Sequence, residues 1–293
     1  MLTHGQATLK LQTVTPTIVS RFVNHVGYTG SGSSIDTGKV LAKEEASSQQ
    51  LGFNNLINTT RGINGLAFDI ANLPGSVTAS DFIFQMSPLE VFNEAANPVS
   101  GWQLAPAPSS VTVQPGLPGR VLITWPDNAI ANRWLRVTVK ANPNTGLAAP
   151  EVYYLGHLQG ESTGPSGGKF TVLVADILAI RAALTQSTTA SSIVDLDKSG
   201  VVLVAEILAA RSQLSKELTQ ITIPASSGGG GGGFVEEDGL MGSAKDSSQA
   251  PTPTESLWLL SNPSLQAAAY AASVDSALDD LYWTTQRRRG RRS

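Results

Sequence analysis

Twelve residues, from Asp195 to Glu206, have the types and the spacing of an oxygen-donor metal loop. With Asp195 as the first position, carboxylates occupy positions one, three and twelve, serine position five and glycine position six. A calcium loop of this length needs side-chain oxygens at one, three and five, glycine at six, a backbone carbonyl at seven and a carboxylate at twelve. We therefore predict that Ca2+ is bound by Asp195, Asp197, Ser199, the carbonyl of Val201, and Glu206.

The donor set also limits which metal fits. Three carboxylates and a hydroxyl suit a hard cation, and nothing in the loop suits zinc or copper. Leu203 at position nine cannot coordinate through its side chain, so water is expected there, and Val202 is expected to pair with an equivalent loop. The same residues could form an ordinary polar turn that caps the next helix. Calcium is favoured because Gly200 and Glu206 stand where a metal, rather than a cap, requires them.

The helix predicted after this loop is present twice. The segments Val172–Leu184 and Val202–Leu214 are identical at nine of thirteen positions, with Asp176 in the first copy where Glu206 stands in the second. This indicates an internal duplication of about thirty residues.

The first copy does not repeat the metal ligands. Counted back from Asp176, positions one, three, five and six hold Pro165, Gly167, Lys169 and Phe170. None of these offers a ligand, and Lys169 would bring a positive charge to the position of the cation. We predict one working loop and one vestigial loop.

Composition excludes several classes of function. The chain of 293 residues has 20 basic and 23 acidic residues, and five of the basic ones lie in the last seven positions, so the body is mildly acidic. A general nucleic-acid surface is therefore not expected. Cysteine is absent, which excludes disulfides and thiolate sites. No apolar run approaches the roughly 18–20 residues of a membrane span.

Hydrophobic periodicity divides the chain into four parts. Residues 1–158 contain short alternating runs between turn clusters, which predicts an antiparallel β-sandwich. Residues 160–222 have helical spacing, 225–260 form a Gly/Ser/Pro-rich linker, and 261–293 are predicted as one helix with a basic tail. The fold class is thus mainly β with a small α module. The predicted core residues are Leu66, Phe68, Ile70, Phe82, Phe84, Met86, Val121, Ile123, Trp125, Leu135, Val137 and Val139.

Catalytic motifs are not found. The sequence has no nucleophile elbow, phosphate-binding glycine loop or metal helix. The three histidines are scattered and are expected to be satisfied structural residues: His4, His25 and His157. Paired carboxylates for glycoside cleavage stay open, because three aspartates lie near strand ends: Asp69, Asp81 and Asp127. We predict that the protein is not an enzyme.

Aromatic residues support an alternative function. A sugar-stacking platform could form from Trp102, Trp125, Trp134, Tyr153 and Tyr154. Trp125 and Trp134 lie in strand-like runs and are expected in the core, which leaves Trp102 and the tyrosines for a carbohydrate-binding face.

The segment "DLDKSGVVLVAE" with the doubled "VLVA[DE]ILA" resembles a type I dockerin over about residues 160–222. The resemblance implies that calcium folds the module and that its helices bind a cohesin-type partner. Carried over by position, the partner face comprises Val204, Ala205 and Arg211 with their counterparts Val174, Ala175 and Arg181.

The β region also carries a resemblance. "RFVNHVGYTG", "RGINGLAFDIANLPG" and "EVYYLGHLQGE" are similar to the β module that precedes the dockerin in large secreted proteins of planctomycete-type bacteria. This implies an extracellular or cell-surface location. The first residues lack the apolar core of a signal peptide, so we expect either a cytoplasmic protein or the C-terminal piece of a longer secreted polypeptide.

Together these features predict a noncatalytic, extracellular attachment or assembly module that binds calcium. Its expected partners are a cohesin-like protein or other modules of the parent polypeptide. The alternative is an accessory region of a polysaccharide-degrading enzyme, with the sandwich binding the glycan. A third possibility is a structural terminal domain without calcium.

Overall fold

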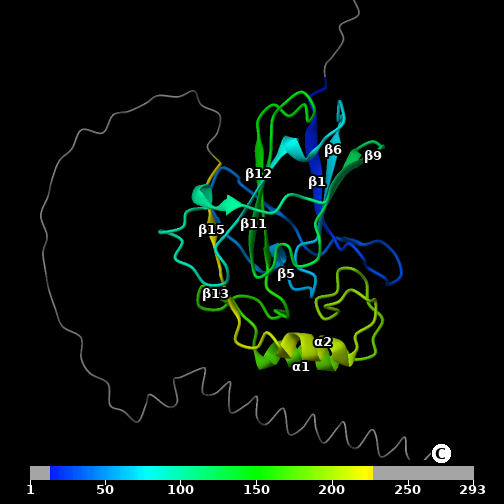
Figure 1. The fold of residues 1–293 in the computed structure, drawn as a ribbon, viewed down its shortest axis with the longest axis vertical. Helices are drawn as coiled ribbons and strands as arrows, with labels where there is room; N and C mark the ends of the chain where they lie inside the picture. The colour runs from blue at the N-terminus through cyan, green and yellow to red at the C-terminus, as the bar shows by residue number, and fades with distance from the viewer. Residues whose placement is uncertain (1–13, 227–293) are drawn as a thin grey trace, which may run out of the picture.

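The computed structural model of the chain describes residues 14–226 (Figure 1). Its described part is mainly β, with antiparallel sheets and two helices, as the sequence predicted. His4, the predicted linker from residue 227 onwards and the predicted helix at 261–293 lie outside the described residues.

The first sheet has five strands in the order β2-β1-β6-β10-β9, all antiparallel. Its strands are β1 (Thr17–Asn24), β2 (Ile35–Asp36), β6 (Gly65–Ala71), β9 (Ser110–Gln114) and β10 (Gly119–Thr124).

The second sheet has the order β3-β12-β11-β7-β8, and β5 adds a parallel pairing to β12. Its strands are β3 (Ala42–Lys43), β5 (Leu56–Ile57), β7 (Phe82–Met86), β8 (Gln103–Leu104), β11 (Arg133–Val139) and β12 (Glu151–His157). Three short 3-10 turns connect strands: η1 (Phe53–Asn55), η2 (Ala79–Asp81) and η3 (Val99–Gly101).

The two sheets share one hydrophobic cluster. Successive side chains of a strand point to opposite faces, so alternate apolar residues collect on one side. Of the predicted core residues, all but Met86 belong to this cluster. Met86 is half-buried at the end of β7, where its sulfur lies 3.2 Å from Nη1 of Arg133.

The six-stranded sheet is buried on its other face as well. Trp134 and Tyr154 belong to a second cluster, while their neighbours Leu135 and Tyr153 belong to the first. Part of the cover comes from residues that follow the second sheet in the chain: Phe170, Leu218, Ile221 and Ile223. A buried indole needs an acceptor, and Nε1 of Trp134 donates to the carbonyl of Thr219 at 2.8 Å.

Short strand pairings hold this cover in place. The strand β13 (Lys169–Thr171) pairs with β14 (Glu217–Thr219), and β15 (Thr222–Ile223) pairs with β4 (Gln49–Gln50). The pairing of β15 with β4 therefore joins segments on the two sides of the domain boundary predicted between residues 158 and 160. The division into domains itself stays a prediction.

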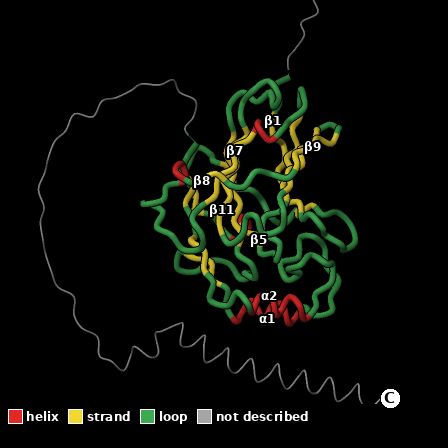
Figure 2. Tube along the Cα trace, in the orientation of Figure 1, coloured by secondary structure: helices red, strands yellow, loops and turns green. Residues whose placement is uncertain are grey.

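The two helices lie side by side at one end of the molecule (Figures 1 and 2). They are α1 (Val174–Ala182) and α2 (Val204–Arg211), and neither of these two described helices has the length and apolar character needed to cross a bilayer. Between them is a third cluster, formed by Ile177, Ile180, Ala183, Leu196, Val202, Ile207 and Ala210. The sequence predicted that Val202 pairs with an equivalent loop. Instead, its backbone pairs with Thr185 and Gln186.

Both described histidines are buried and hydrogen-bonded, as expected of structural residues. The amide of Asn132 donates to Nδ1 of His157 at 2.9 Å, so Nε2 carries the proton and donates to the carbonyl of Thr59 at 2.8 Å. His25 lies 3.2 Å from Asp36. Burial lowers the pKa of His157 to about 4.

This burial predicts a loss of stability in acid. The unfolded chain takes up a proton on His157 as the pH falls from 6.5 towards 4, whereas the folded chain does not. We expect the free energy of unfolding to fall across this window with a slope of up to about 1.4 kcal/mol per pH unit. Urea unfolding of the wild type and His157→Gln at a series of pH values measures this contribution. An identical pH dependence in the two proteins would contradict it.

Candidate metal centre

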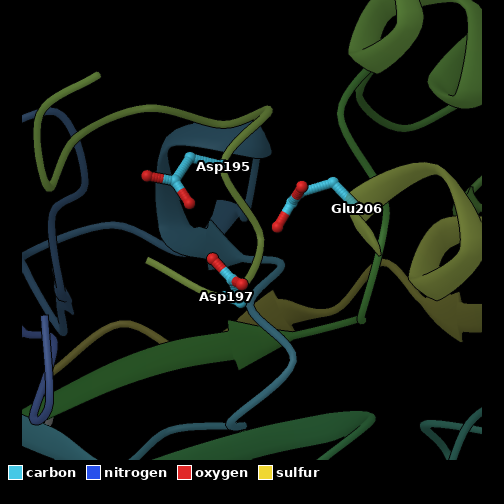
Figure 3. Close-up of side chains that lie close together, drawn as sticks. All are labelled: Asp195, Asp197 and Glu206. Carbon is cyan, nitrogen blue, oxygen red and sulfur yellow. The ribbon is translucent and has the colours of Figure 1, made fainter. Parts of the chain in front are cut away.

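The predicted loop brings three carboxylates together. Asp195 and Asp197 lie on the loop before α2, and Glu206 is the third residue of that helix. One carboxylate oxygen from each residue lies within 4.8 Å of the other two, and Figure 3 shows the three side chains converging. Asp195 and Glu206 are fully buried, and Asp197 is half-buried. This acidic triad could hold a metal ion.

The backbone wraps around the first carboxylate of the loop. Asp195 accepts hydrogen bonds from the amides of Ser199 at 3.1 Å and Gly200 at 2.8 Å, and from the hydroxyl of Thr188 at 2.6 Å. Gly200 has a φ of +88°, in the left-handed region that glycine occupies without strain. The tight turn at position six therefore forms as the sequence predicted.

The two neutral oxygens predicted as ligands are neighbours. The hydroxyl of Ser199 donates to the carbonyl of Val201 at 3.0 Å, and the amide of Ser199 also donates to Asp197 at 2.9 Å. Both oxygens therefore lie on the same stretch of loop as the carboxylates.

Glu206 has one satisfied oxygen and one unsatisfied oxygen. Its Oε2 accepts a hydrogen bond from the amide of Leu203 at 2.6 Å, which caps the first turn of α2. Its Oε1 is buried and has no hydrogen-bond partner among residues 14–226. An unsatisfied buried carboxylate oxygen carries its full desolvation cost, so it needs a counter-charge or a proton. The residues present therefore fit a cation in the space between the three carboxylates.

Burial and the neighbouring carboxylates shift the pKa values of the residues in the triad. Burial raises the pKa of Glu206, and the negative charge of Asp197 adds to the increase. Burial alone would also raise the pKa of Asp197, but hydrogen bonds from Ser199 hold it below its usual value. The Lys198 ammonium donates to the carbonyl of Ser192, and its charge also interacts with that of Asp195.

The loop is anchored to the β part of the chain through its backbone carbonyls. Thr60 N donates to the carbonyl of Leu196 at 2.9 Å, and Arg61 Nε to that of Asp197 at 3.2 Å. Thr29 N donates to the carbonyl of Lys198 at 3.1 Å. This loop therefore lies at the junction between the helices and the β part of the chain.

The structure corrects the register assigned to the first copy. Lys169 was predicted at the position of the cation, but it lies in β13, where its ammonium pairs with Glu217 at 3.0 Å. Phe170 is buried against the six-stranded sheet. These residues therefore form a strand in place of the predicted vestigial loop.

Trp125 and Trp134 are buried, as expected of core residues. The carbohydrate-binding face predicted from the other aromatic residues is not formed by them, because Trp102, Tyr153 and Tyr154 are buried as well and have no face free to stack on a sugar.

The three aspartates at strand ends each have a different partner. Asp69 pairs with Arg120 at 2.6 Å, Asp81 accepts from Asn142 and Asn144, and Asp127 accepts from Asn64.

The sequence analysis did not predict two residues that the structure places in or near the duplicated unit. Thr188 donates to Asp195 from a segment with no motif. Glu161 is a fully buried carboxylate that precedes the expected register of the first copy, so the twelve-residue spacing could not find it.

The chain was compared with known proteins. No family model, no curated protein and no solved structure matches it.

The contact between Gly200 and Gly30 gives a test of the loop. A Cβ on Gly200 would lie 2.4 Å from Cα of Gly30, whereas a Cβ on Gly32, which has a φ of +96°, would meet nothing within 4 Å. Alanine at either position bears the left-handed strain of roughly 1–2 kcal/mol. We expect Gly200→Ala to lower the melting temperature more than Gly32→Ala and to weaken calcium binding. Equal effects of the two variants on both quantities would contradict the close approach.

Proposed function

We propose that this protein is a noncatalytic attachment or assembly module whose helical repeat is held in shape by calcium. The observation that carries the proposal is the buried Oε1 of Glu206, which has no partner among the described residues and lies beside the carboxylates of Asp195 and Asp197. Ca2+ binds between these groups with the Ser199 hydroxyl and the Val201 carbonyl as further ligands.

Calcium is favoured over other metals by the donor set. All the ligands are oxygens, and calcium accepts six to eight of them in flexible geometry, whereas magnesium demands near-ideal octahedral ligands at shorter distance. The ion is structural in this proposal, because two of its carboxylates are buried and leave little room for a substrate.

Binding of the ion stabilises more than the loop. The loop carries Leu196 and Val202 into the cluster between the helices, and its carbonyls are bonded to Thr29, Thr60 and Arg61 of the β part. At a calcium concentration about 100 times the dissociation constant, the ion adds about 2.7 kcal/mol to the stability of the fold. The ion therefore stabilises both the helical repeat and its contacts with the β part.

The outward faces of the helices provide the attachment surface. Several large apolar side chains there are 44–59% exposed: Leu173, Leu178, Leu203, Val204 and Leu208. Of the six residues carried over from the dockerin resemblance, Val204, Ala205, Ala175 and Arg181 are exposed and Val174 and Arg211 are half-exposed. An apolar patch on a small helical unit suits a protein partner, and the dockerin resemblance makes that partner cohesin-like and the setting extracellular.

Calcium titration by calorimetry tests the metal site. Glu206→Gln keeps an oxygen for the amide of Leu203 but removes the negative charge. We expect this variant to lose one binding event or to bind it more than about 100-fold more weakly. Glu217→Gln, which changes a half-buried carboxylate in β14, is the matched control and should behave as the wild type. Unchanged binding in Glu206→Gln would rule out this site.

The attachment surface is tested with purified cohesin domains as probes. We expect at least one of a panel to bind in calcium and to dissociate in chelator. The double variant Val204→Asp/Leu208→Asp should bind no probe, because both side chains are exposed and their loss removes apolar contact area without affecting the core. Failure of every probe, with calcium binding intact, would count against a cohesin-like partner.

A further inference from the structure

A pocket lies where the described part of the chain ends. It has a volume of about 340 Å³, and its walls come from the segment around η3 and from β15 with the residue that follows it. Phe92 and Trp102 line it from the first stretch, and Ile223 and Pro224 line it from the second. The described residues end at Ser226, two positions after Pro224. Residues 227–293 therefore continue from the wall of this pocket.

The wall of the pocket is mainly apolar. Eight of its twelve residues have apolar side chains. Polar groups of the wall are already hydrogen-bonded to one another. The carboxylate of Glu94 accepts from the amide of Thr222 at 2.8 Å, and Nε1 of Trp102 donates to the carbonyl of Asn97 at 3.2 Å. Because these groups are satisfied within the wall, the pocket suits an apolar side chain rather than an ion or a sugar.

The pocket is large enough for an aromatic side chain. An engineered apolar cavity of roughly 150 Å³ holds a benzene molecule. The pocket beside η3 has about twice that volume. An indole ring or a leucine side chain therefore fits.

The sequence that continues from the pocket contains a matching occupant. Residues 257–260 read Leu-Trp-Leu-Leu, which is the longest uninterrupted run of large apolar side chains among residues 227–293. Removing such side chains from water is favourable wherever an apolar surface can receive them. The residues before this run are rich in glycine, serine and proline, and positions 228–233 are all glycine.

The stretch between the pocket and the apolar run has a suitable length. Thirty-one positions separate Ser226 from Leu257. A Gly/Ser-rich chain of that length spans roughly 30 Å on average, so its far end can return to the wall from which it starts. A tether of this kind holds the run at an effective concentration on the order of millimolar. Even a contact of modest affinity is then occupied within one molecule.

We propose that residues 257–260 bind in the pocket between η3 and β15 of their own chain, with the Trp258 indole inside the cavity beside Val99. The docked run extends the second hydrophobic cluster, to which Trp102, Ile221 and Ile223 belong. This inference uses none of the residues of the candidate metal centre and does not depend on the proposed function.

Disulfide trapping in the full chain tests this docking, because the chain has no cysteine of its own. Ser48 is exposed and lines the pocket, and Ser256 directly precedes the apolar run, so Ser48→Cys/Ser256→Cys leaves both apolar surfaces intact. A disulfide forms only when the two Cα atoms approach within about 7 Å. The control pair is Ser76→Cys/Ser256→Cys, because Ser76 is also exposed but is not part of the pocket wall. We expect the pocket pair to form an intramolecular disulfide at least about tenfold faster than the control pair.

The products of trapping separate the outcomes. A faster intramolecular disulfide in the pocket pair supports the docking. Equal rates for the two pairs overturn it. A disulfide-linked dimer that forms faster than the intramolecular product also overturns it, and means that the run binds the pocket of a second copy of the chain.

Hydrogen exchange of the full chain gives a second readout that leaves the pocket residues unchanged. The double variant Trp258→Ser/Leu259→Ser replaces only residues of the proposed occupant. We expect amides of residues 92–102 to exchange severalfold faster in this variant than in the wild type, because the docked run no longer protects them. Amides of β6, in the core between the sheets, should exchange at the wild-type rate. Wild-type exchange in residues 92–102 of the variant would overturn the docking.

Discussion

The constraint on which the structure depends is the mutual repulsion of buried carboxylates. Two unit charges 4 Å apart interact by about 4 kcal/mol at an effective dielectric constant of about 20. Asp195, Asp197 and Glu206 place three such groups within 4.8 Å of one another. A folded protein is stable by only about 5–15 kcal/mol, so this repulsion must be relieved by protonation or by a cation. The raised pKa of Glu206 is a shift in the direction of the first solution, and the proposed calcium ion would be the second.

The location of the triad determines which parts of the structure the repulsion between the carboxylates affects. The loop that carries Asp195 and Asp197 also supplies Leu196 to the cluster between the helices and carbonyls to the β part of the chain. The β part also contacts the strand β14 through Trp134, whose indole donates to the carbonyl of Thr219. The proposed cation would thus act on a loop that three packed regions share, and would stabilise the junction between them as well as the loop.

The sequence predicted those features that depend on a fixed period. Alternation within strands placed Phe68, Val121 and Val137 in the core, because each strand exposes one face to the same cluster. The twelve-residue spacing predicted the triad, because a loop of this length brings its first residues close to the start of the following helix.

Features set by tertiary contacts could not be predicted in this way. Trp102 and the tyrosines were expected at a sugar-binding face. Trp102 and Tyr154 instead pack in the second cluster with residues distant in sequence such as Ile221, and Tyr153 lies in the cluster between the sheets. No local pattern signals this packing. Lys169 and Phe170 were assigned to a vestigial loop on the assumption that both copies have loops of equal length, whereas they lie in β13. The same assumption concealed Glu161.

The most direct test of the central claim is the free energy of unfolding of the wild type and Glu206→Gln, each measured in calcium and in chelator at mildly alkaline pH. If repulsion among the carboxylates is relieved by the cation, the order of stability reverses. Glu206→Gln should be at least as stable as the wild type in chelator and clearly less stable in calcium. A variant that is less stable than the wild type by the same amount in both conditions would contradict the account. Glu206 would then stabilise the fold through its packing and hydrogen bonds and not through a bound cation.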